Sequence, residues 1–106
     1  MNFRQELECI RQSKADDVVS KANSFLAETS QQLKELKTFR ADSKLVIFYK
    51  SVTLTIKIVE GSEIHSVQYA NHAELVDVYN AICKKLTEDG CKYHSCDKPF
   101  EIFIDN

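Results

Sequence analysis

The sequence predicts an α+β fold in which a long N-terminal helix and a second helix pack on one face of an antiparallel sheet of four to five strands. The first glycine is Gly61 and the only proline is Pro99, so long regular elements are expected at the start. Apolar residues follow helical spacing to about residue 39, alternate through 52–58, and return to helical spacing after Asn71. The expected order is α(α)-β-β-β-α-β-β, in a single α+β domain covering 1–106.

Residues 1–40 are expected to form a helical N-terminal segment. Lys14 and Asp17 interrupt its apolar stripe, and Ser13 followed by Asp16 is similar to an N-cap with an acidic partner three positions later. The sequence therefore fits either one helix with a weak point at 13–16 or two helices, the second covering about 14–38. The apolar stripe consists of Phe3, Leu7, Ile10, Val18, Ala22, Phe25, Leu33 and Leu36.

Two adjacent apolar pairs, Val18–Val19 and Phe25–Leu26, widen this stripe. Neighbours on a helix lie about 100° apart, so each pair covers more than one packing surface requires. The helix is either sunk deeply against its own sheet or contacts a second chain on its other side. We favour the second interpretation, because a single domain offers limited surface to both faces.

Residues 44–106 are expected to form the sheet and a helix at 71–89. The segment Leu45–Tyr49 is apolar on both faces, which is typical of a central strand or one that pairs across an interface. Residues 52–58 alternate, and Gly61-Ser62 suits a two-residue hairpin turn with positive φ at Gly61. That turn predicts three cross-strand pairs on the apolar face, namely Ile58 with His65, Ile56 with Val67 and Leu54 with Tyr69.

Asn71 and Glu74 are spaced as in a capping box and open the second helix, while Gly90 suits its end. A short strand through CKYHSC follows, and then the strand FEIFI. Phe100, Ile102 and Ile104 are expected to face the core, with Phe103 on the opposite side.

Composition limits the possible functions. The chain has 106 residues, is 43% hydrophobic and has a net charge of −2, which is typical of an ordered globular domain. Its basic and acidic residues are spread over both halves, so neither half is a polycation. No apolar run approaches the ~20 residues of a membrane span, and the start lacks the apolar region of a signal peptide. We therefore expect a cytoplasmic protein, not bound to membranes, with reduced cysteines.

The motif CKYHSC raises the question of a metal site. The candidate ligands are Cys91, His94 and Cys96, with Cys83 upstream, but their spacing differs from the paired C-x₂-C pattern of structural zinc sites. We expect ordinary thiols and no metal. A disulfide, either Cys91–Cys96 or Cys83–Cys91, is the other alternative.

A cluster of basic residues near the end of the first helix is a candidate nucleic-acid site: Lys34, Lys37, Arg40 and Lys44. No aromatic residue alternates with them as a stacking surface. From about residue 14 to 86 the element order resembles that of double-stranded RNA-binding domains. The basic helix start and loop residues of that family have no match here, so its function is not transferred, and nucleic acid is not the expected partner.

The sequence contains no catalytic triad order and no phosphate-binding glycine loop, so we expect no enzyme activity and no cofactor. The expected function is protein binding, as an adaptor, chaperone-like or inhibitory partner of another protein, by a homodimer. The element order is similar to that of small acidic secretion chaperones, which are dimers that bind extended protein segments, although this chain stops short of their final helix. The candidate interface residues are Val19, Leu26, Leu33, Val46, Phe48 and Phe103.

Overall fold

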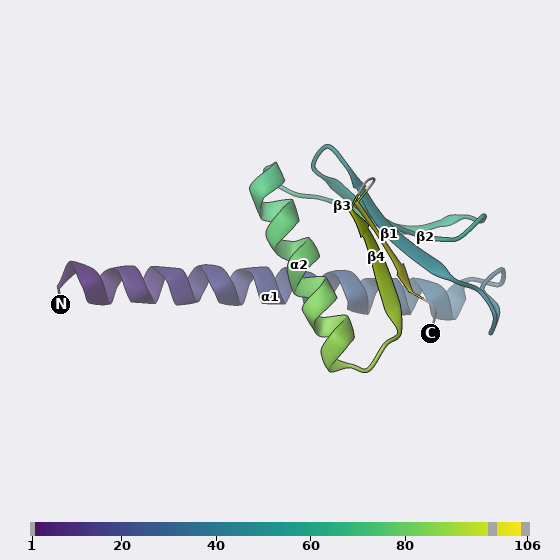
Figure 1. Cartoon of the computed structure of the whole chain (residues 1–106), viewed down its shortest axis with the longest axis horizontal. Coiled ribbons are helices and arrows are strands. Elements are labelled where there is room, and N and C mark those ends of the chain that lie inside the picture. The colour runs from purple at the N-terminus through teal and green to yellow at the C-terminus, as the bar shows by residue number, and fades with distance from the viewer. Residues whose placement is uncertain (1, 98–99, 105–106) are drawn as a thin grey trace.

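A computed structural model describes residues 2–97 and 100–104 and confirms the predicted α+β architecture (Figure 1). The sheet has the strand order β3-β2-β1-β5-β4, and every neighbouring pair is antiparallel. β1 is therefore the central strand, as its apolar composition predicted. The elements in chain order are α1 (Phe3–Glu35), β1 (Leu45–Lys50), β2 (Thr53–Ile58), β3 (Glu63–Gln68), α2 (His72–Glu88), β4 (Tyr93–Asp97) and β5 (Phe100–Ile104).

α1 is one unbroken helix of 33 residues, so the two-helix alternative is wrong. The helix starts at a capping box, in which the Asn2 side chain accepts a hydrogen bond from the Gln5 backbone and the Gln5 side chain accepts one from the Asn2 backbone. At the expected weak point, the Gln12 side chain donates to the Asp16 carboxylate at 2.9 Å. Without a glycine or proline to break it, the segment gains more by continuing the helix than by using Ser13 as a cap.

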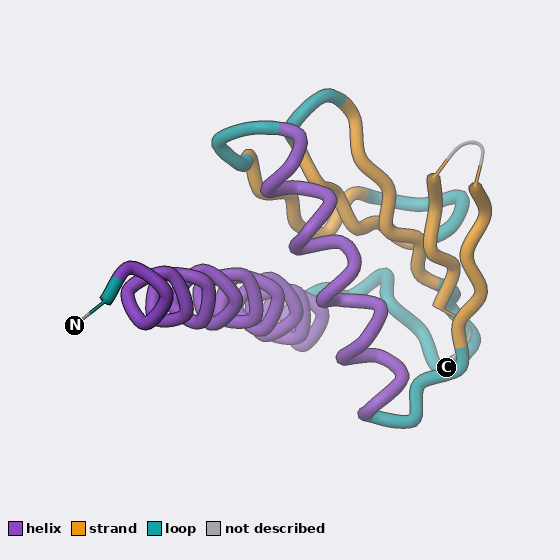
Figure 2. Tube along the Cα trace, turned by 60° about the vertical axis from the view of Figure 1, so that its left-hand side comes forward, coloured by secondary structure: helices purple, strands orange, loops and turns teal. Residues whose placement is uncertain are grey.

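Both helices cover the same face of the sheet (Figure 2). From α1, Ala22 and Phe25 enter the core, and Thr29 is buried with its hydroxyl donating to the Phe25 carbonyl at 2.8 Å. These residues meet alternate positions of the strands, since only every second residue of a strand faces the helices. The fully buried residues of the same core are Ile47, Leu54, Ile56 and Ile102 from the sheet and Leu75, Val78 and Ile82 from α2.

The β2–β3 hairpin forms, but its predicted register is wrong by two residues. Leu54 pairs with Val67 and Ile56 pairs with His65. The register shifts at a bulge between Ile56 and Lys57, the last pair is Lys57 with Glu63, and Glu60 takes the positive φ of 63° that was expected at Gly61. Because the side-chain period of a strand is two, this shift leaves the same residues facing the core.

Gly61 is required for a different reason. A Cβ at this position would lie 3.1 Å from the Cβ of Ile58, closer than side chains normally approach. Glycine therefore lets the turn fold back against Ile58, which is itself buried.

The attachment of α1 depends on Phe25, which is 1% exposed and lies with its ring centre 5.3 Å from that of His65 on β3. We expect Phe25→Ala to lower the free energy of unfolding by about 3–5 kcal/mol, because it removes a buried ring and leaves a cavity. Urea unfolding followed by circular dichroism measures this change. The exposed neighbour Ser24→Ala is the control and should stay within about 0.5 kcal/mol. A loss below about 1 kcal/mol for Phe25→Ala would contradict this packing.

Candidate protein-binding surfaces

The N-terminal part of α1, residues 3–17, projects beyond α2 and the sheet, and we call it the arm (Figure 1). The molecule measures 55 × 25 × 22 Å, and the arm accounts for the long axis. Every arm residue is exposed except Leu7, which is half-buried. Phe3 is 74% exposed and Ile10 is 55% exposed, and with Leu7 they lie on one side of the helix at helical spacing. The arm thus presents an apolar stripe with nothing packed on it among the described residues.

Among the described residues, the hydrogen bonds and ion pairs of the arm are all local. Besides the cap at Asn2, Arg4 lies 3.7 Å from Glu8, and Lys21 lies 3.0 Å from Asp17 at the arm's base. Exposed pairs at this spacing contribute about 0.3–0.5 kcal/mol each. A helix of this length is marginal in water on its own. A partner packed on the apolar stripe would therefore stabilise the arm as well as bind it.

The widened stripe of α1 is divided between the molecule's own core and the solvent. Val18 and Leu26 are half-buried and pack against the core, and Leu33 is half-buried as well. Val19 remains outward, at 52% exposed. Leu26 therefore packs within its own domain, whereas Val19 remains accessible to a partner.

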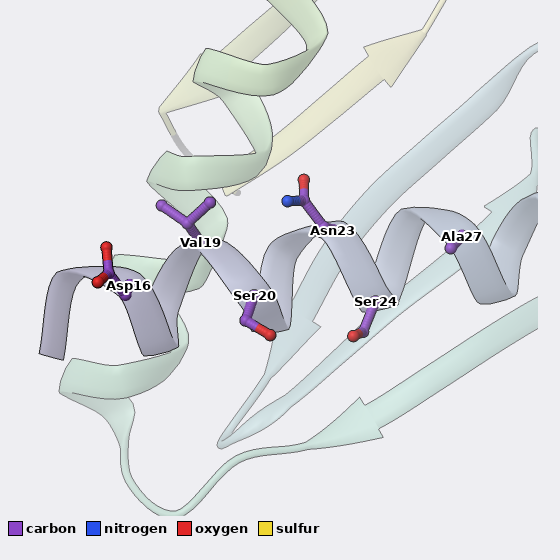
Figure 3. A pocket seen from close by; sticks show the side chains of 6 residues that line it. All are labelled: Asp16, Val19, Ser20, Asn23, Ser24 and Ala27. Atoms are coloured by element: carbon purple, nitrogen blue, oxygen red, sulfur yellow. The ribbon is translucent and has the colours of Figure 1, made fainter. Parts of the chain in front are cut away.

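Val19 lines a shallow hollow on the outer flank of α1 that begins at Asp16 (Figure 3). Its side chain and that of Asn23 point to one side of the helix, and those of Ser20 and Ser24 point to the other. The hollow continues to Ala27. The side chains here are short, so another element could approach the helix backbone closely.

The face of the sheet opposite the helices holds Val46, Phe48 and Phe103. Val46 and Phe48 flank Ile47, which faces the core, so both point the other way. Phe103 is the register partner of Val46 on β5. Val46 is only 3% exposed between its neighbours, whereas Phe48 and Phe103 are half-buried.

Basic and aromatic side chains accompany the two phenylalanines of this face. Lys57 Nζ lies 6.0 Å from the ring centre of Phe48, and His94 stacks on Phe103 with ring centres 5.1 Å apart. Cations over aromatic rings are attracted by the negative face of the ring. The surface is therefore a small aromatic patch bordered by Lys57, and neither helix covers it.

The structure does not bring the candidate metal ligands together. Cys83 on α2 and Cys91 after it are half-buried free thiols that pack against the core. His94 lies on the opposite face of the sheet, on Phe103. Among residues 2–97 and 100–104, no three His, Cys, Asp or Glu side chains converge. The side chain of Cys96 lies outside the described residues, so the Cys91–Cys96 alternative does too, while Cys83 and Cys91 are not bonded to each other.

The four basic residues proposed for nucleic acid lie where α1 passes into β1. Lys34 is in the last turn of α1, and Lys37, Arg40 and Lys44 follow in the connection. All four are exposed, and none forms an ion pair with another residue in the described part of the chain.

Sequence reasoning missed a group of polar residues where α1, β3 and α2 meet. The ammonium of Lys21 on α1 donates a hydrogen bond to Glu74, at the start of α2, and contacts Asp17. The bonds to Glu74 and Asp17 raise the pKa of Lys21. Burial raises the pKa of Tyr69, and the negative charge of Glu74 adds to the effect. The i,i+4 pair Asp17–Lys21 was visible in the sequence. Glu74 lies 53 positions after Lys21, and no sequence pattern links the two residues.

No protein-family model, curated protein or solved structure matches this chain. Within residues 2–97 and 100–104, neither helix combines the length and the apolar character that a bilayer span requires.

Among the described side chains, three groups have a raised pKa, and all three predict lower stability at alkaline pH. Burial raises the pKa of the Cys83 thiol and of the Tyr69 phenol, and carboxylate partners raise that of the Lys21 ammonium. The folded state therefore holds these protons to higher pH than the unfolded chain does. From about pH 9 upward the unfolded state binds fewer protons, so the free energy of unfolding should fall as pH rises.

Urea unfolding at a series of pH values from neutral upward measures this dependence. Tyr69→Phe and Cys83→Ala should each make the alkaline decline shallower, because each removes one of the shifted groups. Asn80→Ala, at an exposed α2 position, should leave the slope unchanged. Stability that rises above about pH 9 would contradict the assignment.

Proposed function

We propose that this chain is a small, non-enzymatic, cytoplasmic protein-binding domain that acts as a homodimer and serves as an adaptor, chaperone-like or inhibitory partner of another protein. The observation that supports it is the arm, a helix segment that leaves the domain with Phe3 and Ile10 facing solvent. Complete burial of a side chain of this size stabilises an association by about 1.5–3 kcal/mol. A monomer gains nothing from these residues, whereas a complex does.

The arm alone is too small to hold two chains together. A stable interface covers about 800 Å² on each partner, which is more than a stripe of three side chains offers. We therefore infer that the interface extends from the arm to a neighbouring surface of the domain. The patch of Phe48 and Phe103 is the candidate with exposed apolar surface, because Val19 lies about 180° around α1 from Ile10 and faces the other way.

The dimer is tested by placing a charge on the apolar stripe of the arm. Light scattering of the wild type should give about twice the 12.2 kDa of one chain. Ile10→Asp should give a single chain without loss of fold, because Ile10 packs against nothing in its own domain and an interfacial carboxylate would be desolvated. Cys9→Asp adds the same charge at the exposed adjacent position, about 100° around the helix, and should remain dimeric.

Amide hydrogen exchange of residues 3–17 gives a second readout. In the Ile10→Asp monomer these amides should exchange much faster than those of α2, since the arm is then unsupported. A wild-type monomer whose arm is already protected would contradict the proposal, because no partner would then be needed.

The alternative function is a weak association with nucleic acid. It is favoured by the exposure of Lys34, Lys37, Arg40 and Lys44 together at the end of α1. Retention on heparin at low salt should then be lost when these four are changed to Gln, and kept when the exposed Lys84 and Lys92 are changed instead. A wild-type protein that passes through the column unretained would remove this alternative.

A further inference from the structure

A cleft of about 160 Å³ lies between α1 and the end of β3, next to the hollow of Figure 3, with which it shares Ser20 and Ser24. Three successive turns of α1 supply its polar wall, with Ser20, Ser24 and Glu28 spaced four residues apart. Lys21 lies beside them, and Tyr69, just after β3, forms the opposite wall. The space corresponds to about five water molecules at ~30 Å³ each, so it suits one side-chain head group rather than a small-molecule substrate.

The Tyr69 side chain in this cleft lacks a hydrogen-bond partner. Tyr69 is only 7% exposed, and no residue in 2–97 or 100–104 hydrogen-bonds to its hydroxyl. The ring is buried, whereas the hydroxyl oxygen opens to solvent at the cleft, where water or a ligand can hydrogen-bond to it. Since burial and the charge of Glu74 raise the pKa of this phenol, it stays neutral and can accept or donate a hydrogen bond. A ligand in the cleft can therefore take the place of water on this hydroxyl.

The charges around the cleft select the kind of partner. Glu28 and Lys21 are the charged residues that line it, and two further carboxylates, those of Asp17 and Glu74, lie on the Lys21 ammonium. The charge of Lys21 is offset by two carboxylates, since it contacts both Asp17 and Glu74. Glu28 keeps most of its carboxylate in solvent at 61% exposed, and one oxygen lies 2.8 Å from Nε2 of His65. The site thus carries an excess of negative charge and favours a cation.

His65 does not remove this excess. Its Nε2 is buried, and although the distance to Glu28 is that of an ion pair, the two atoms are not aligned as a hydrogen bond. The second oxygen of Glu28 is accordingly open to another donor. Ser20 and Ser24, both exposed, add hydroxyl acceptors on the same wall.

We propose that this cleft binds an arginine side chain presented by a partner protein. The inference rests on the proposed protein-binding function and names the chemistry of one of its contacts. A guanidinium is planar and has five donors, so it can bond to Glu28 while reaching the Tyr69 oxygen. A lysine ammonium is compact and more strongly hydrated, so it matches the two walls less well.

The test uses the full-length protein and two blocked amino acids. N-acetyl-arginine N-methylamide is the probe, and the corresponding citrulline derivative is an uncharged probe of nearly the same shape. In amide NMR spectra, the arginine probe should shift residues 20–28 and 67–69 with saturable, millimolar binding. The citrulline derivative should bind at least about tenfold more weakly, because it lacks the charge that Glu28 recognises.

Variants then locate the binding. Glu28→Gln should weaken the arginine probe about tenfold, and its exposed position makes it safe for folding. Tyr69→Phe should weaken binding severalfold while keeping the buried ring. Glu88→Gln, an exposed carboxylate in the last turn of α2, is the matched control and should not change affinity.

Each other outcome overturns the proposal. Equal binding of the two probes would show that charge does not matter, and unchanged affinity in Glu28→Gln would place the probe elsewhere. If the amide signals of residues 20–28 do not shift at millimolar probe, the polar residues of the cleft serve only to hold α1 in place. These results are independent of the dimer test, since the arginine probe can bind a monomer and an Ile10→Asp dimerisation defect can occur with an intact cleft.

Discussion

The docking of α1 through Ala22 and Phe25 is the interaction on which the rest of this structure depends. These two residues are the points at which the helix enters the core, and Thr29 extends the contact by one turn. Everything before Val18 lies outside this contact. The same few side chains therefore hold the helix to the domain, leave its first half free, and set the wall of the cleft beside Tyr69. Helical stability in proteins comes mainly from packing of this kind, so the arm depends on the docked half for its conformation.

The sequence predicted the elements well because their signals are local. The central position of β1 followed from its two apolar faces, and the start of α2 followed from Asn71, whose side chain accepts a hydrogen bond from the Glu74 backbone at 2.8 Å. The hairpin shows where local signals stop. Gly61 was assigned the positive φ, but the chain places that conformation at Glu60 and uses Gly61 for a close approach to Ile58. Alternation fixes which face a residue occupies, but a shift of two residues satisfies it equally well.

The exposure of the candidate surfaces could be predicted only in part, because it depends on how distant segments pack together. Helical spacing identified Val19 and Leu26 as surplus apolar residues, yet it could not tell which of them α2 and the sheet would cover. Alternation placed Val46, Phe48 and Phe103 on the face opposite Ile47, where the structure has them. The group formed by Lys21, Glu28, Tyr69 and Glu74 needed the tertiary structure, because its members come from three elements.

The unbroken helix also fixes the angular relation between its two ends. Phe3 and Lys21 are separated by eighteen residues, as are Ile10 and Glu28, and eighteen residues make five full turns. The apolar stripe of the arm and the acidic cleft therefore share one azimuth, about 27 Å apart along a straight rod. A single extended or helical ligand running parallel to α1 could engage both at once. After the first contact, the second would form at a high effective concentration. Two individually weak contacts would then give one high-affinity interaction.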